Sequence, residues 1–147
     1  MKFKFHLEKV LKHKKILEDQ AKREFGEISR RVREQEDYLK NLENDLSIAI
    51  ENKYRIQQMG GSIASYLEFF HYYYGAQKQM IENQKKIIQG LEKILEEKRQ
   101  FLVQAAREHK TFIALKDKKK EEFIKEQKKR EQKRLDDMNI MRQNAVA

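Results

Sequence analysis

The sequence predicts an all-α fold, a long antiparallel two-helix coiled-coil hairpin. Charged residues make up 39% of the 147-residue chain, proline is absent, and apolar residues recur at helical spacing. This combination is typical of long helices that share a narrow apolar seam. The evident break between the two helices is Gly60-Gly61, because the chain has only five glycines and glycine accepts the positive φ that ends a helix.

We expect a single coiled-coil domain over residues 1–147. It comprises a first helix over about 3–58, a hinge at 59–62, a second helix over about 63–140 and a loose C-terminal tail. Ser62 is the expected N-cap of the second helix, since its hydroxyl accepts hydrogen bonds from the free N–H groups of the next turn. So short a link makes the helices antiparallel, which sets residue 3 near residue 118 and leaves the last 20 or so residues of the second helix without a partner.

Apolar residues at alternating steps of three and four predict the seam of the first helix. These residues are Phe3, Leu7, Val10, Leu17, Ala21, Phe25, Ile28, Val32, Leu39, Leu42, Leu46, Ala49 and Ile56, with polar steps at Gln35 and Lys53. Between Leu17 and Phe25 two steps of four follow each other. We expect this departure from the heptad to unwind the supercoil slightly.

The second helix repeats the pattern more clearly. Its seam residues are Ile63, Leu67, Phe70, Tyr74, Gln77, Ile81, Gln84, Ile88, Leu91, Leu95, Lys98, Leu102, Ala105, His109 and Phe112. Polar side chains in a seam weaken the pair but help to fix its register. A second, offset row widens the apolar stripe and indicates a further partner: Met80, Ile87, Ile94, Phe101 and Leu115.

The net charge of +9 is concentrated in two segments. Residues 1–15 carry six Lys and one Glu, and residues 116–134 carry ten Lys or Arg and five Asp or Glu. Residues 16–115 are neutral, with sixteen basic and sixteen acidic residues. In a hairpin both basic segments lie at the open end, so we expect a positive tip.

The sequence argues against a metalloprotein, a nucleotide-binding enzyme, a disulfide-bonded protein and a membrane-spanning protein. The four histidines lack metal-ligand spacing, and Gly60-Gly61 lacks the Lys-Ser/Thr of a phosphate-binding loop. Cysteine is absent, and no apolar run approaches the roughly 20 residues that span a bilayer. We therefore predict no catalytic residue, no cofactor and no metal, and a cytoplasmic or surface-bound protein that is not an enzyme.

Two stretches have two interpretations each. The aromatic run Tyr66 to Tyr74 either closes the hinge end of the hairpin or forms an exposed protein-binding patch. The basic stretch Lys116 to Arg134 invites a nucleic-acid interpretation, but its interleaved acids and lone aromatic, Phe123, argue against one. A helix end steered into an acidic protein cavity fits the same charge.

Three stretches together resemble the FliJ family of the bacterial flagellar type III export apparatus. They are Phe3 to Leu11 (FKFHLEKVL) with Glu18, the hinge Met59 to Ser65 (MGGSIAS), and Lys129 to Asp137 (KREQKRLDD). The resemblance covers the whole chain in length and in hairpin design. It implies a fold similar to the central stalk of rotary ATPases.

The resemblance also implies a function and partners. A stalk of this family inserts its terminal end into the hexameric ring of the export ATPase FliI and promotes ring assembly and activity. It contacts the export gate protein FlhA, escorts export chaperones, and lies at the cytoplasmic face of the inner membrane through its protein partners. Neither nucleic acid nor a cofactor is implied.

The resemblance assigns residues to two contact surfaces. Export-gate contacts fall on Tyr38, Leu42, Tyr74, Lys78, Ile81 and Lys85. ATPase-ring contacts fall on Phe5, Leu7, Val10, Leu11, Phe123, Lys129, Arg130 and Arg134. Because Leu42, Tyr74 and Ile81 are also seam residues, the gate surface requires either a locally rotated register or half-exposed flanks.

Three alternatives remain open. The first is the equivalent stalk of a virulence type III secretion system, with the same mechanism and other cargo. The second is a basic coiled coil that binds nucleic acid, with affinity falling steeply with salt. The third is a self-assembling scaffold that dimerises through the row Met80-Ile87-Ile94-Phe101.

Overall fold

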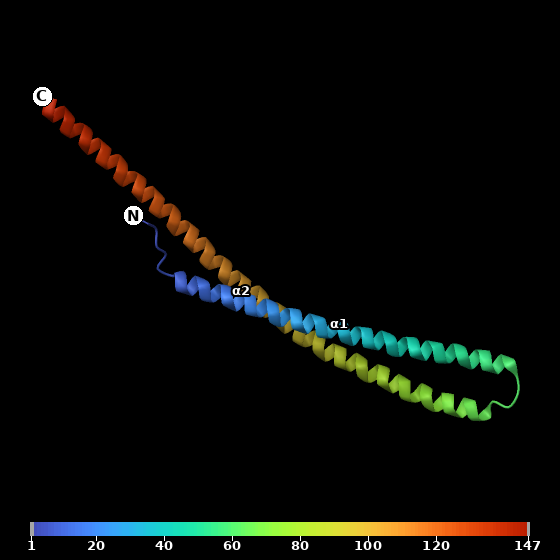
Figure 1. The fold of residues 1–147 in the computed structure, drawn as a ribbon. Coiled ribbons are helices and arrows are strands. Elements are labelled where there is room, and N and C mark those ends of the chain that lie inside the picture. The colour runs from blue at the N-terminus through green and yellow to red at the C-terminus, as the bar shows by residue number, and fades with distance from the viewer. Residues whose placement is uncertain (1, 147) are drawn as a thin grey trace. The chain divides into compact units, whose positions relative to one another are not determined.

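Figure 1 shows the computed structural model, which describes residues 2–146 as two helices. Helix α1 is Glu8–Met59 and helix α2 is Ala64–Val146, and residues 2–146 contain no strand. The all-α prediction is therefore confirmed. Contacts divide the chain into two compact units. One unit joins the residues up to Gln20 with those from Val103 onward, and the other is Ala21–Leu102.

The unit Ala21–Leu102 is an antiparallel helix pair whose register is held by buried glutamines. The Gln77 amide donates to the backbone carbonyl of Leu42 at 3.1 Å, and the Gln84 amide donates to that of Gln35 at 3.0 Å. One heptad forward on α2 thus corresponds to one heptad back on α1. A slip in register would strand both buried amides without partners, at about 1–3 kcal/mol each.

The core of this unit is narrow. Leu42, Leu46 and Ile81 form its central cluster, and each keeps 6–9% of its surface exposed. A pair of helices covers only one stripe on each helix, so no side chain among residues 2–146 is fully buried. The buried residues of α2 follow the predicted seam: Phe70, Gln77, Ile81, Gln84 and Ile88.

The hinge between the helices depends on two glycines. Gly60 has a φ of 77° and Gly61 a φ of 92°, values that L-residues with a Cβ rarely adopt. Ile63 provides the first carbonyl of α2, accepting from the Leu67 N–H at 2.9 Å. Ser62 therefore lies one residue ahead of the cap position, and its prediction as N-cap is wrong.

The first helix starts at Glu8 rather than at residue 3, because residues 2–5 are extended. In an extended segment, alternate side chains point the same way. Phe3 is half-buried and Phe5 buried, whereas Lys2 and Lys4 are exposed. On a helix, residues 3 and 5 would point in nearly opposite directions, so only the extended form buries both rings.

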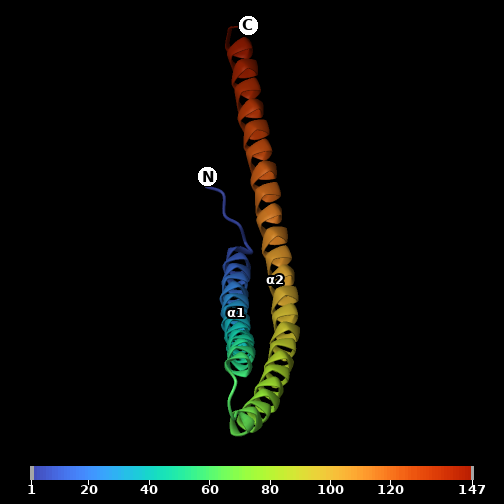
Figure 2. The same cartoon turned by 90° about the vertical axis from the view of Figure 1, so that its right-hand side faces the viewer.

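The extended segment also changes the predicted pairing at this end. The ring of Phe3 lies 5.6 Å from that of Phe123, between ring centroids, rather than near residue 118. An extended chain advances about 3.3 Å per residue against about 1.5 Å in a helix, so Phe3 reaches further along α2. Figure 2 shows this segment beside α2.

The predicted seam of α1 is wrong in its first turns. Val10 and Leu17 are each 36% exposed, while Leu11 is buried and Lys14 and Glu18 are half-buried. The inner positions Leu7, Leu11, Lys14, Glu18, Ala21 and Phe25 alternate regularly in steps of four and three. The expected departure from the heptad between Leu17 and Phe25 therefore does not occur, because polar residues occupy two of the seam positions.

The C-terminal end also differs from the expectation. Instead of ending near residue 140 with a loose tail, α2 continues to Val146; Ala147 lies outside the described residues. No glycine or proline follows Gly90, so nothing in the sequence interrupts the helix. In residues 2–146, no helix is long and apolar enough to cross a membrane.

Candidate protein-binding surfaces

Three ion-pair contacts link α1 and α2 in the unit that contains both chain ends. Glu18 Oε2 lies 2.5 Å from His109 Nδ1, and both side chains are mostly buried. Lys14 pairs with Glu108 at 3.0 Å, and Lys116 pairs with Glu8 at 2.9 Å. These contacts hold the start of α1 against α2 although the seam there contains few apolar residues.

The carboxyl of Glu108 shows how these contacts between α1 and α2 affect a pKa. Hydrogen bonds from Gln104 and from Lys14, in that order, lower the pKa of Glu108. Both contacts favour the charged carboxylate. Water partly screens these interactions, because 39% of the Glu108 side chain is exposed. The Glu108 carboxylate therefore keeps its charge, and its pair with Lys14, to lower pH than a carboxyl with an unshifted pKa would.

The eight residues assigned to the ATPase ring fall into two groups. Phe5 and Leu11 are buried and Leu7 and Phe123 half-buried, so these four pack within the protein. Phe123 also contacts Phe3, which attaches the N-terminal segment to α2. The four residues are therefore available to a partner only through their remaining exposed edges.

The other four residues of that set are accessible. Val10 is 36% exposed, and Lys129, Arg130 and Arg134 lie on a part of α2 where every side chain from Lys128 to Val146 is exposed. Residues 2–20 do not accompany α2 along this part (Figures 1 and 2). The segment 124–146 carries seven Lys or Arg and four Asp or Glu, a net charge of +3. An exposed, positively charged helix end is suited to an acidic partner.

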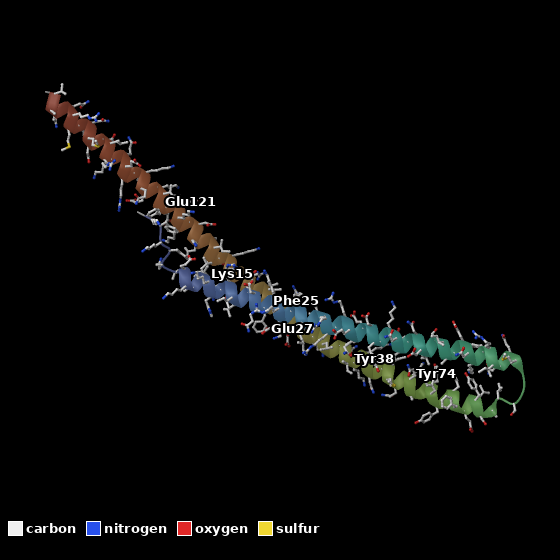
Figure 3. The ribbon with its side chains drawn as sticks, viewed as in Figure 1. Lys15, Phe25, Glu27, Tyr38, Tyr74 and Glu121 are labelled. Atoms are coloured by element: carbon white, nitrogen blue, oxygen red, sulfur yellow. The ribbon has the colours of Figure 1, made fainter. Side chains whose placement is uncertain are left out.

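The six residues assigned to the export gate also divide by burial. Leu42 and Ile81 belong to the central cluster of the unit Ala21–Leu102, with 6% and 8% of their surface exposed. Tyr74 packs against that cluster and is half-buried, whereas Tyr38 is 46% exposed. Figure 3 shows Tyr38 on α1 and Tyr74 on α2. The register is not rotated, so Leu42 and Ile81 are core residues.

Two lysines accompany Tyr74 on α2. Lys78 places its Nζ 5.0 Å from the centre of the Tyr74 ring, and its hydrogen bond with Tyr74 raises the pKa of Lys78. Lys85, one heptad further on, contacts Glu82 at 3.8 Å. Tyr74, Lys78 and Lys85 thus form a continuous accessible strip of one aromatic ring and two ammonium groups.

Tyr38 lies on the other side of the helix pair. In an antiparallel pair, the positions just before the first seam residue of each heptad flank one side, and the positions just after the second seam residue flank the opposite side. Tyr38 precedes the seam residue Leu39, as Met80 precedes Ile81, whereas Lys78 and Lys85 each follow a seam glutamine. The six predicted gate residues therefore do not share one face.

The aromatic run at the hinge end has a buried part and an exposed part. Phe70 is buried, and Tyr66, Tyr73 and Tyr74 are half-buried, so part of the run closes the pair. Phe69 and Tyr72 are 68% and 80% exposed. A shallow hollow beside them is lined by Ala49, Asn52, Tyr66, Phe69, Phe70 and Tyr73. Exposed aromatic rings beside a hollow are typical of a protein-binding surface.

Sequence patterns missed two features of these surfaces. The alternation of Lys and Phe in residues 2–5 was the signal for the extended segment. The seam residues Lys14 and Glu18 were missed because the apolar residues Val10 and Leu17 gave a competing seam in the same turns. No group of His, Asp and Glu side chains suited to a metal ion is present within residues 2–146.

Comparison with known proteins gives one match. The family described as Flagellar FliJ protein matches residues 3–145, nearly the whole chain. No curated protein and no solved structure matches the chain.

Proposed function

The chain belongs to the FliJ family of flagellar proteins, so its role is associated with flagellar export. We propose that it serves there as the non-catalytic stalk whose free helix end enters the ring of the export ATPase. There it promotes assembly and activity of the hexameric ring. It acts at the cytoplasmic face of the membrane through its protein partners and escorts export chaperones.

The bare, basic end of α2 is the observation that carries this proposal. From Lys128 the helix continues without a break to Val146, exposes every side chain and has a net charge of +3. Because the side chains from Lys128 to Val146 are exposed, docking would stabilise this helix end, since isolated helical segments of this length are marginal in water. Positive charge steers it toward an acidic opening.

Contact with the export gate is proposed for the accessible strip Tyr74, Lys78 and Lys85. Tyr combines ring area with a polar tip, which makes it a frequent centre of protein interfaces. The two ammonium groups favour an acidic partner surface. Leu42 and Ile81 support this strip from the core and do not touch the gate, and Tyr38 lies outside the strip.

ATP hydrolysis by the export ATPase tests the stalk function directly. The full chain should stimulate hydrolysis, and the variant Lys129→Gln/Arg130→Gln/Arg134→Gln should need roughly tenfold more protein for the same stimulation at low salt. The matched control neutralises three exposed cations of the other unit, Lys40→Gln/Arg55→Gln/Lys93→Gln. This control should stimulate as the original chain does.

Two results would contradict the stalk function. One is an active ATPase that the full chain leaves unstimulated at every concentration. The other is equal loss of stimulation in both triple variants, which would mean that total charge and not the helix end determines binding.

A further inference from the structure

A row of large apolar side chains runs along α2 outside the seam. Met80 is 44% exposed, Ile87 51%, Ile94 40% and Phe101 69%. They recur every seven residues, so they lie on one face of the helix, each directly ahead of the seam residues Ile81, Ile88, Leu95 and Leu102. Helix α1 already covers the seam, so this face, which we call the outer row, has no partner among the described residues of its unit.

A row of small residues runs beside the outer row. Ala76, Asn83 and Gly90 also recur every seven residues, four before Met80, Ile87 and Ile94. The Asn83 amide oxygen accepts a hydrogen bond from Gln79 at 3.1 Å, which folds this side chain back along its own helix. No atom lies within 4 Å of the position that a Cβ would take on Gly90. The small row is therefore open to an approaching helix.

We propose that the outer row binds a second copy of this chain, with the two α2 helices antiparallel. In this arrangement three of the four large residues of one copy face the row of smaller residues of the other: Phe101 meets Ala76, Ile94 meets Asn83 and Ile87 meets Gly90. Met80 lies on the aliphatic stem of Glu97. The same surface is used by both copies, as a two-fold dimer requires, and large residues set against small ones let helices approach closely.

The two rows select the antiparallel orientation. Parallel pairing in register would set each large residue of the outer row against the same large residue of the other copy, whereas antiparallel pairing sets the large residues against the smaller row. The outer row itself lies within the neutral region 16–115, so its approach to a second copy carries little repulsion.

The size of the surface sets the strength of the dimer. The exposed fractions of the four large residues correspond to about two whole side chains, on the order of 400 Å² from each copy. Together the two copies lose about 800–1,200 Å² with the flanking residues, the lower end of specific interfaces. The dimer therefore forms reversibly, at micromolar and higher concentrations.

Sedimentation of the full chain across a wide concentration range tests the dimer. The weight-average mass should rise from monomer toward dimer as concentration increases, and Ile87→Glu should hold the chain at the monomer mass. Ile87 is half exposed, so the variant keeps its helices, as circular dichroism will verify. The matched control Gln89→Glu adds the same charge to an exposed position away from the row. It should dimerise as the original chain does.

Engineered cysteines test the orientation, because the chain contains none of its own. Mild oxidation of a mixture of Ala76→Cys and Phe101→Cys chains should give disulfide-linked dimers that hold one chain of each kind. Phe101→Cys chains alone should stay unlinked. Linked pairs of Phe101→Cys chains, a monomer at every concentration, or a dimer that Ile87→Glu leaves intact would each overturn the proposal.

Discussion

At the residue scale, burial separates side chains that build the helix pair from those a partner can reach. Leu42 and Ile81 share one core cluster, whereas Tyr74 lies at its edge with Lys78 over its ring. Neighbouring residues of the predicted gate surface thus differ in role: Leu42 and Ile81 stabilise the helix pair, whereas Tyr74 is accessible to a partner. Substitutions of the two kinds should affect different measurements.

Leu42→Ala should lower the free energy of unfolding by about 2–4 kcal/mol, because it removes a buried side chain from a core that has few others. Tyr74→Phe keeps the ring and removes the polar tip, so it should weaken gate binding with a much smaller effect on unfolding. Urea unfolding and binding to the export gate protein measure the two effects. Loss of gate binding by Leu42→Ala at full stability, with Tyr74→Phe unaffected, would reverse the roles assigned to these residues.

The carboxyl of Glu108 makes a pH-dependent contribution to the free energy of unfolding. Its pKa is lowered, first by Gln104 and then by Lys14, so its stabilising contribution is present above the ordinary range of a Glu pKa and is lost as pH falls through the lowered value. Gln104→Leu should raise the pKa of Glu108 toward its ordinary range. A carbon-detected NMR titration measures this pKa, and a value equal to that of the original chain would show that the hydrogen bond has no effect.

At the scale of the helices, the sequence predicted what depends on regular repetition. The seam of α2 from Phe70 to Ile88 was predicted correctly because its polar members, Gln77 and Gln84, continue an apolar heptad on both sides. The start of α1 could not be predicted in this way. Its seam positions Lys14 and Glu18 become inner residues only because Glu108 and His109 of α2 supply partners, which is tertiary information.

Helix ends and binding surfaces were harder to predict for the same reason. Residues 2–5 lie outside the helix in a conformation that buries Phe5 and packs Phe3 against Phe123 of α2, a gain that local helix propensity does not register. The gate set drawn from the family resemblance mixed core with surface, since a linear motif carries no burial. The basic helix end, in contrast, was visible in the charge pattern alone.

Two glycines of α1 and the hinge should respond to alanine in opposite directions. Gly26 lies inside α1, and a Cβ there meets no atom within 4 Å, so Gly26→Ala should stabilise the chain by about 0.5–1 kcal/mol. Gly60 has a φ of 77°, so Gly60→Ala should destabilise it by about 1 kcal/mol. Thermal unfolding of both variants gives the comparison. Equal shifts of the same sign would contradict the assigned backbone conformations.

At the scale of the whole molecule, the two compact units support different tasks. The unit Ala21–Leu102 contains the hinge, the exposed aromatic rings, the gate strip and the outer row. The unit with both chain ends uses the Phe3–Phe123 contact, two ion pairs and the Glu18–His109 contact to anchor the N-terminal segment, and α2 is exposed from Lys128 onward. We infer that the first unit meets the export gate and the second meets the ATPase.

Site-specific photo-crosslinking within the complex of this chain and the export ATPase tests this division most directly. A photoreactive residue at Met138, near the bare end of α2, should crosslink to the ATPase ring, whereas one at Ser62 in the hinge should not. Both positions are exposed, so neither substitution disturbs the core. Crosslinks to the ring from Ser62 and none from Met138 would contradict the central claim that the free helix end enters the ring.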